Sequence, residues 1–75
     1  MTRKSEVDKL RILLPHWIEH NMEHATEFRR WAGVADEAGE DIHAAAKQME
    51  GANRALKSAL ERLGGALEGG HNHHA

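Results

Sequence analysis

Cysteine is absent from this chain of 75 residues. Its absence excludes disulfide bonds, thiolate zinc sites, iron–sulfur clusters and thiol redox chemistry. Tyrosine is absent too, and Pro15 and Phe28 are the only residues of their types. So short a chain is close to the lower limit at which one hydrophobic core can hold a fold. Without disulfides, we expect a partner chain or a metal ion to contribute stability.

Long apolar runs are also missing, since the longest, Leu10 to Leu14, is interrupted by Arg11. The sequence therefore predicts no transmembrane helix, and no secretion signal follows its basic start. Ten basic and twelve acidic residues are interspersed and leave a formal charge of −2, which argues against binding to a phosphate backbone. We expect a soluble, cytoplasmic protein that binds neither membranes nor nucleic acid.

Helical periodicity covers most of the chain, and no strand signal is visible. One helix is expected over about residues 6–32 and a second over about residues 35–63, with a tight turn between them. The sequence therefore predicts an all-α fold, an antiparallel helical hairpin over residues 1–65, followed by a flexible Gly/His tail over residues 66–75.

Two residues govern the expected course of the first helix. Ser5 is the expected N-cap. Pro15 removes one backbone hydrogen bond and clashes with the carbonyl of Arg11, so we expect a kink there or a helix that starts closer to Pro15.

Both helices carry residues at alternating spacings of three and four, which is typical of coiled-coil packing. A single hairpin leaves one face uncovered, so two copies are expected to form a homodimeric four-helix bundle. Trp17 and Trp31 are expected in the core, and Asn21 is expected to set the register. The predicted seams are Leu10, Leu14, Trp17, Asn21, His24, Phe28 and Trp31 in the first helix, and Ala35, Ala38, Ile42, Ala45, Met49, Ala52, Leu56, Leu60 and Leu63 in the second.

Histidine is the compositional outlier, with seven residues where average usage predicts about one or two. His16, His20 and His24 recur every four residues on one helix, so each is rotated only ~40° from the one before. These three residues, here called the ladder, are the predicted main metal site. Neutral imidazole suits nickel(II), and also Zn(II), Cu(II) and Co(II). His71, His73 and His74 in the tail form a predicted weaker site.

The segment from His16 to His24 reads H-W-x-x-H-x-x-x-H. It resembles the motif of the CooJ-type nickel-binding accessory proteins of carbon monoxide dehydrogenase. The plan of a dimerising helical region followed by a histidine-bearing tail is similar as well. The resemblance implies a nickel(II) site at the ladder with Trp17 as its aromatic member. It also implies a role as metallochaperone or buffer, with a nickel enzyme such as carbon monoxide dehydrogenase, or its maturation proteins, as partner.

Two other interpretations remain open, and a third is rejected. The hairpin could be a purely structural dimerisation module that binds no specific metal. Glu40 and His43 have the E-x-x-H spacing of di-iron bundles, which makes a carboxylate-bridged site in a dimer conceivable. Glu19 and Glu23 give H-x-x-E-H spacings like those of zinc peptidases, but a short hairpin has too little surface to enclose a substrate cleft. We therefore expect no enzymatic activity.

Overall fold

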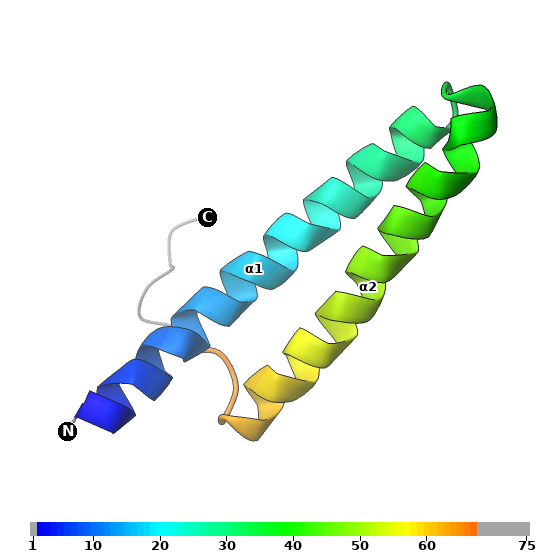
Figure 1. The fold of residues 1–75 in the computed structure, drawn as a ribbon. Helices are drawn as coiled ribbons and strands as arrows, with labels where there is room; N and C mark the ends of the chain where they lie inside the picture. Colours follow the sequence, from blue (N-terminus) through cyan, green and yellow to red (C-terminus); the bar gives the residue numbers. More distant parts are fainter. Residues whose placement is uncertain (1, 68–75) are drawn as a thin grey trace.

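The computed structural model describes residues 2–67. Two long antiparallel helices, α1 (Thr2–Ala32) and α2 (Gly39–Arg62), pack side by side, and the short 3-10 helix η1 (Asp36–Ala38) precedes α2 (Figure 1). No strand occurs among the described residues. The predicted all-α helical hairpin is thus confirmed. Within residues 2–67, neither helix combines the length and the apolar character needed to cross a membrane.

Helix α1 differs from its expected course at two places. It begins at Thr2, so Ser5 lies inside the helix and is not its N-cap. It also continues through Pro15 instead of starting near it (Figure 1). The proline frees the carbonyl of Arg11 from its helical partner. The backbone N–H of Leu67 donates to that carbonyl at 3.4 Å, so the lost bond is replaced from outside the helix.

The connection between the helices is longer than expected, because α2 begins at Gly39 and not near residue 35. Asp36 adopts a left-handed backbone with φ of 55°, which turns the chain back toward α1. Gly39 is buried against the end of α1, and a Cβ atom there would lie 2.5 Å from the carbonyl oxygen of Ala32. Glycine therefore permits the close approach of the two helix ends.

Replacing Gly39 with alanine is expected to destabilise the fold by about 1–3 kcal/mol, because backbone atoms must move to admit the methyl group. Gly51→Ala is the matched control, since its Cβ would meet only the side chain of Arg54 at 3.6 Å. That change should stabilise α2 by about 0.5–1 kcal/mol through helix propensity. Urea unfolding at one protein concentration measures both. Equal shifts for the two variants would contradict the close contact at Gly39.

The core between the helices follows a line of small and aliphatic residues. The expected rhythm of three and four residues is present and Leu14 is buried as predicted, but beyond Leu14 the buried line in α1 lies one residue after the predicted seam. Trp17, His24 and Trp31 are exposed in the single chain. From the second predicted seam, Ala38 of η1 and Ala45 and Ala52 of α2 are likewise exposed. The buried residues are Leu14, Ile18, Ala25 and Ala32 in α1, and Gly39, Ala46 and Asn53 in α2.

A buried amide pair fixes how the helices align. Asn53 is 5% exposed; its Nδ2 donates to the carbonyl of Ile18 at 2.9 Å, and its Oδ1 accepts from Nδ2 of Asn21 at 3.0 Å. A shift of either helix by one turn would leave these buried polar groups without partners, at a cost of about 1–3 kcal/mol. Asn21 therefore makes the kind of contact expected of a residue that sets register.

One flank of the hairpin carries a groove lined by Pro15, Ile18, Met22, Lys57 and Leu60. Further along the same flank, Arg29 and Glu50 form an ion pair at 2.7 Å between α1 and α2. The hydrogen bond from Arg29 lowers the pKa of the Glu50 carboxyl. The contribution of this pair to stability is thus present at neutral pH and is lost as the pH falls through the lowered pKa.

Candidate metal centre

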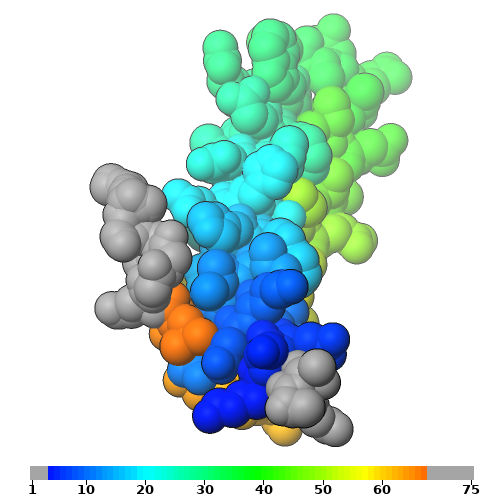
Figure 2. Space-filling view, turned by 90° about the vertical axis from the view of Figure 1, so that its left-hand side faces the viewer, coloured from blue at the N-terminus to red at the C-terminus, as the bar shows by residue number. Residues whose placement is uncertain are grey.

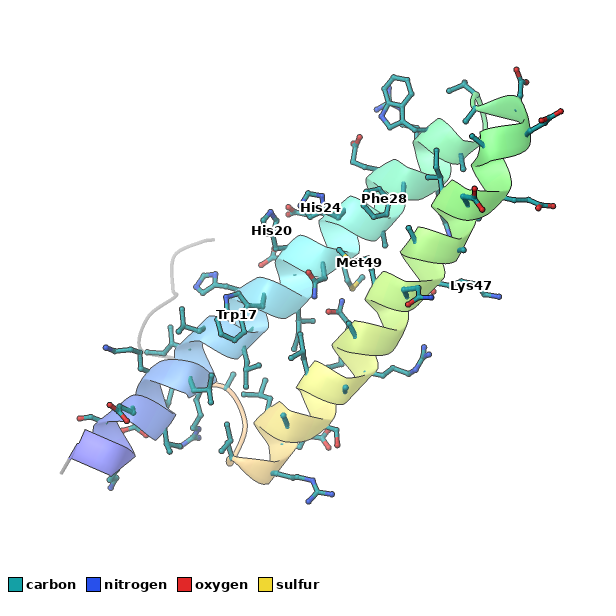
Figure 3. All side chains as sticks on the ribbon, in the orientation of Figure 1. Trp17, His20, His24, Phe28, Lys47 and Met49 are labelled. Carbon is teal, nitrogen blue, oxygen red and sulfur yellow. The ribbon has the colours of Figure 1, made fainter. Side chains whose placement is uncertain are left out.

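All three ladder histidines lie on α1 and are exposed in the single chain. His20 and His24 project from the side of α1 that faces away from α2 (Figure 3). Their ring centroids are 4.6 Å apart and the ring planes are inclined by 44°. The ring of Phe28 follows, 6.0 Å from that of His24. One edge of α1 therefore carries two adjacent imidazoles continued by an aromatic ring.

The separation of the His20 and His24 rings suits chelation of one metal ion. Two imidazole nitrogens bound side by side, each about 2.1 Å from a metal, lie roughly 3 Å from each other. Rings of this size with centroids 4.6 Å apart reach that separation by small side-chain rotations. Because both residues belong to one regular helix, the backbone fixes the spacing of the pair without any metal ion.

The whole ladder does not converge on one point. His16 and His24 are eight residues apart, which corresponds to ~12 Å along a helix. Residues 2–67 contain no group of three or more histidine, aspartate or glutamate side chains placed to hold one metal ion. A single hairpin therefore offers the His20–His24 pair, with His16 one turn away. Any further ligands must come from another copy, from outside the described residues, or from solvent.

Acidic side chains accompany the ladder. Glu19 and Glu23 line a shallow hollow with His16 and His20, and Glu23 also lines the next hollow, beside His20 and His24. Carboxylates beside metal-binding imidazoles orient the rings and increase their basicity. Within residues 2–67, however, no hydrogen bond joins Glu19 or Glu23 to the imidazoles.

Large apolar side chains lie exposed along the same side of α1. Trp17 is 44% exposed and Trp31 53%, and the indole N–H of Trp31 donates to Glu27 at 3.2 Å. Met49 of α2 projects toward α1 near Phe28 (Figure 3). Helical geometry puts Met49 and Leu56 on one side of the buried line of α2, and Glu50 and Lys57 on the other. We call this surface the aromatic face; it comprises Leu13, Trp17, His24, Phe28, Trp31, Met49, Ala52 and Leu56.

Seen from the α1 side, α1 extends along the described molecule with α2 visible beside and behind it (Figure 2). Periodicity placed Trp17, His24 and Trp31 on the seam of a four-helix bundle; in the single chain they are exposed on this outer surface and do not pack against α2 as core residues. The sequence signal that could have identified the core is the residue that follows each of these three: Ile18, Ala25 and Ala32. The two alanines among them are small enough to let the helices approach closely.

Other predicted ligands lie apart from the ladder. Glu40 and His43 are exposed on α2, and within residues 2–67 they are not part of a metal-binding cluster. His71, His73 and His74 lie outside the described residues.

Over residues 10–63, the sequence matches a family described as a domain of unknown function (DUF8180). The chain belongs to this family. The match spans the ladder and both sides of the hairpin core, and it stops before the histidines of the tail. No curated protein matches the chain, and no solved structure matches it.

Proposed function

We propose that this DUF8180 protein is a non-catalytic, cytoplasmic carrier or buffer of nickel(II) that works as a homodimer. The observation that supports the proposal best is the pair of exposed imidazoles, His20 and His24, with ring centroids 4.6 Å apart on one helical edge. Imidazole nitrogen is a ligand type that nickel(II) accepts readily. The ladder motif supplies the preference for nickel and for a client such as carbon monoxide dehydrogenase or its maturation proteins, through its resemblance to CooJ-type proteins.

The aromatic face supports a second copy of the chain as partner. A monomer with Trp17, Phe28 and Trp31 along one stripe exposes apolar surface that association would remove from water. Most homodimers are twofold symmetric and bring the same patch of each chain together. His24 lies seven residues after Trp17 and seven before Trp31, so an antiparallel contact centred on this stripe brings His24 of both copies near the axis. Two imidazole pairs would then share one nickel ion.

A direct titration tests the function. Untagged protein titrated with nickel(II), zinc(II) and copper(II) by calorimetry is expected to bind one nickel per dimer more tightly than any further nickel. The alternative, a structural dimerisation module, is favoured by the same aromatic face and predicts a dimer with no tight site for any of the three ions. Sedimentation of the metal-free protein at tens of micromolar is expected to show a dimer under both interpretations, so the titration decides between them.

Acidity should weaken nickel binding steeply. A ligand imidazole must lose its proton before it binds metal, and free imidazole titrates near pH ~6.5. Nickel is therefore expected to raise the melting temperature at pH 7.5 and to lose most of this effect at pH 5.5, because metal that binds only the folded dimer stabilises it in proportion to binding. Carboxylate ligands, which titrate near ~4, would keep their affinity to about pH 5. An undiminished shift at pH 5.5 would point to glutamate ligands instead.

A further inference from the structure

The groove on the flank of the hairpin is long and has an apolar floor. From Met22 and Lys57 it continues between the two helices as far as Arg29 and Glu50. The part of α1 that borders it, residues 15–29, corresponds to ~21 Å of helix, or about four turns. The floor is formed by Pro15, Ile18, Met22 and Leu60. The groove therefore offers an elongated apolar surface and not a compact pocket.

Contacts between the two sides of the hairpin bound the groove at each end. At one end Ala66 is part of the lining. The segment that contains it is held on α1 by Arg11, whose guanidinium donates to the carbonyl of Gly65 at 2.7 Å and to that of Gly64 at 3.0 Å. At the other end the interhelical ion pair described above joins α1 to α2. The length of the groove is thus set by contacts within the hairpin.

The two rims of the groove carry opposite charges. Glu19 and Glu23 lie on the α1 rim, four residues apart. Arg54 and Lys57 lie on the α2 rim, three residues apart. All four are exposed, and among residues 2–67 none of them forms an ion pair. An apolar floor between a negative and a positive rim is a pattern that a partner can complement in both shape and charge.

An α-helix is the kind of guest that fits this groove. A helix with apolar residues at i, i+3, i+4 and i+7 presents a stripe that packs against a floor between two other helices. An extended peptide would need free backbone groups to pair with. The interiors of α1 and α2 do not offer them, because their N–H and C=O groups bond within each helix.

We propose that the groove docks an amphipathic helix of a partner protein, about four turns long. Its basic edge meets Glu19 and Glu23, and its acidic edge meets Arg54 and Lys57. Turning a helix end for end exchanges its two edges, so rims of opposite charge fix the direction in which the helix lies. Docking needs no metal and goes beyond the proposed function. The docked helix lies beside the ladder, because Glu19 and Glu23 also line the hollow at His20.

This chain does not supply the helix itself. Residues 68–75 contain no apolar side chain larger than alanine, so they lack the stripe that the floor requires. The aromatic face of a second copy is apolar, but placing it in the groove joins two different surfaces. Repeated contacts of that kind form rings or open filaments and not a twofold dimer. A dimer through two aromatic faces leaves the groove of each copy free on the other flank.

Fluorescence anisotropy with designed peptides tests the proposal. The probe is a fluorescein-labelled helical peptide of about 16 residues with a leucine stripe, lysines along one edge and glutamates along the other. It is titrated with the full-length protein in the presence of EDTA, and binding in the range of tens of micromolar is expected. Two further peptides carry lysine, or glutamate, along both edges. Each meets one rim of its own sign, so we expect it to bind about 10-fold more weakly.

Reversing the charge of the α2 rim separates charge matching from unspecific adhesion. Arg54→Glu combined with Lys57→Glu makes both rims acidic. This variant should bind the mixed peptide about 10-fold more weakly and the lysine peptide about 10-fold more tightly, a gain that a misfolded protein would not show. Lys47→Glu, which reverses an exposed charge of α2 outside the groove, should bind as the starting protein does. Met22→Glu places a charge on the floor and should abolish binding of the mixed peptide.

Several results would overturn the docking site. One is that the starting protein binds no peptide, or binds all three equally well. Another is that the double variant keeps the original preference. A third is that Met22→Glu becomes a monomer, because the groove would then hold a second copy of the chain. The Trp31→Glu variant should bind the mixed peptide normally, since Trp31 lies outside the groove. None of these results depends on nickel, so they leave the proposed function to its own titration.

Discussion

Replacing His20 and His24 together with alanine is expected to lower the affinity for the tightest nickel(II) ion by about 100-fold or more. Their rings are 4.6 Å apart on a rigid helix, so the second imidazole binds the ion as an intramolecular step that involves little ordering of the chain. Removing both takes away the only pair of adjacent imidazoles observed within residues 2–67. In the dimer, it takes away two pairs at once. Calorimetric titration of the untagged protein with nickel(II) measures the loss.

The matched control for this experiment is His43→Ala, which removes an exposed histidine from α2 and should leave the tight site unchanged. His16→Ala is expected to reduce affinity less than either single change in the pair, because His16 stands one turn further along the helix. Far-UV circular dichroism should be unaffected, since all the substituted residues are exposed and alanine favours helix. Nickel affinity that survives the double change would show that the ladder is not the main site and would leave the structural module as the better description.

Trp31→Glu is expected to convert the dimer into a monomer at tens of micromolar. A charge within a contact between aromatic faces must be desolvated without a partner, and the indole that contributed apolar area is lost. In the single chain Trp31 is 53% exposed, and its indole contacts are with exposed Glu27 and with Arg30, whose guanidinium lies 5.2 Å from the ring. Its removal should therefore cost the hairpin itself little. Sedimentation velocity over a range of concentrations measures the change.

Met22→Glu is the control, because Met22 is on the same helix, is equally exposed at 53%, and lies nine residues away, which is half a turn around the helix. It points toward the groove flank and not the aromatic face. We expect Met22→Glu to remain a dimer. If Met22→Glu dissociated the dimer and Trp31→Glu did not, the interface would lie on the groove flank and the ladder would be outside it.

The position of His24 on the aromatic face couples nickel binding to dimerisation in the proposed dimer. If two copies share one nickel ion near a twofold axis, metal binding and dimerisation stabilise each other. The Trp31→Glu monomer should then bind nickel more weakly even though its ladder is intact. The double histidine variant should remain a metal-free dimer, since the apolar contacts are still present.

The sequence by itself determined the helical hairpin and the histidine ladder. Both depend on local periodicity: residues repeated every three and four positions form one helical face, and histidines repeated every four positions form one edge, whatever lies beside them. The glycines after Leu63 likewise marked the end of α2, because only a left-handed backbone closes it that way. These features follow from the chain within a few residues of each position.

Only the tertiary structure decided which line of α1 faces α2. Two lines one residue apart, through Trp17 and His24 or through Ile18 and Ala25, have nearly the same spacing, so periodicity cannot choose between them. Close packing chose the smaller side chains, with Ala46 and Gly39 opposite, and this left the tryptophans on the outer surface. The hydrogen bonds that the Arg11 guanidinium donates to the carbonyls of Gly64 and Gly65 were also invisible in the sequence. These glycines lie more than fifty residues away and contact Arg11 only after the hairpin has closed.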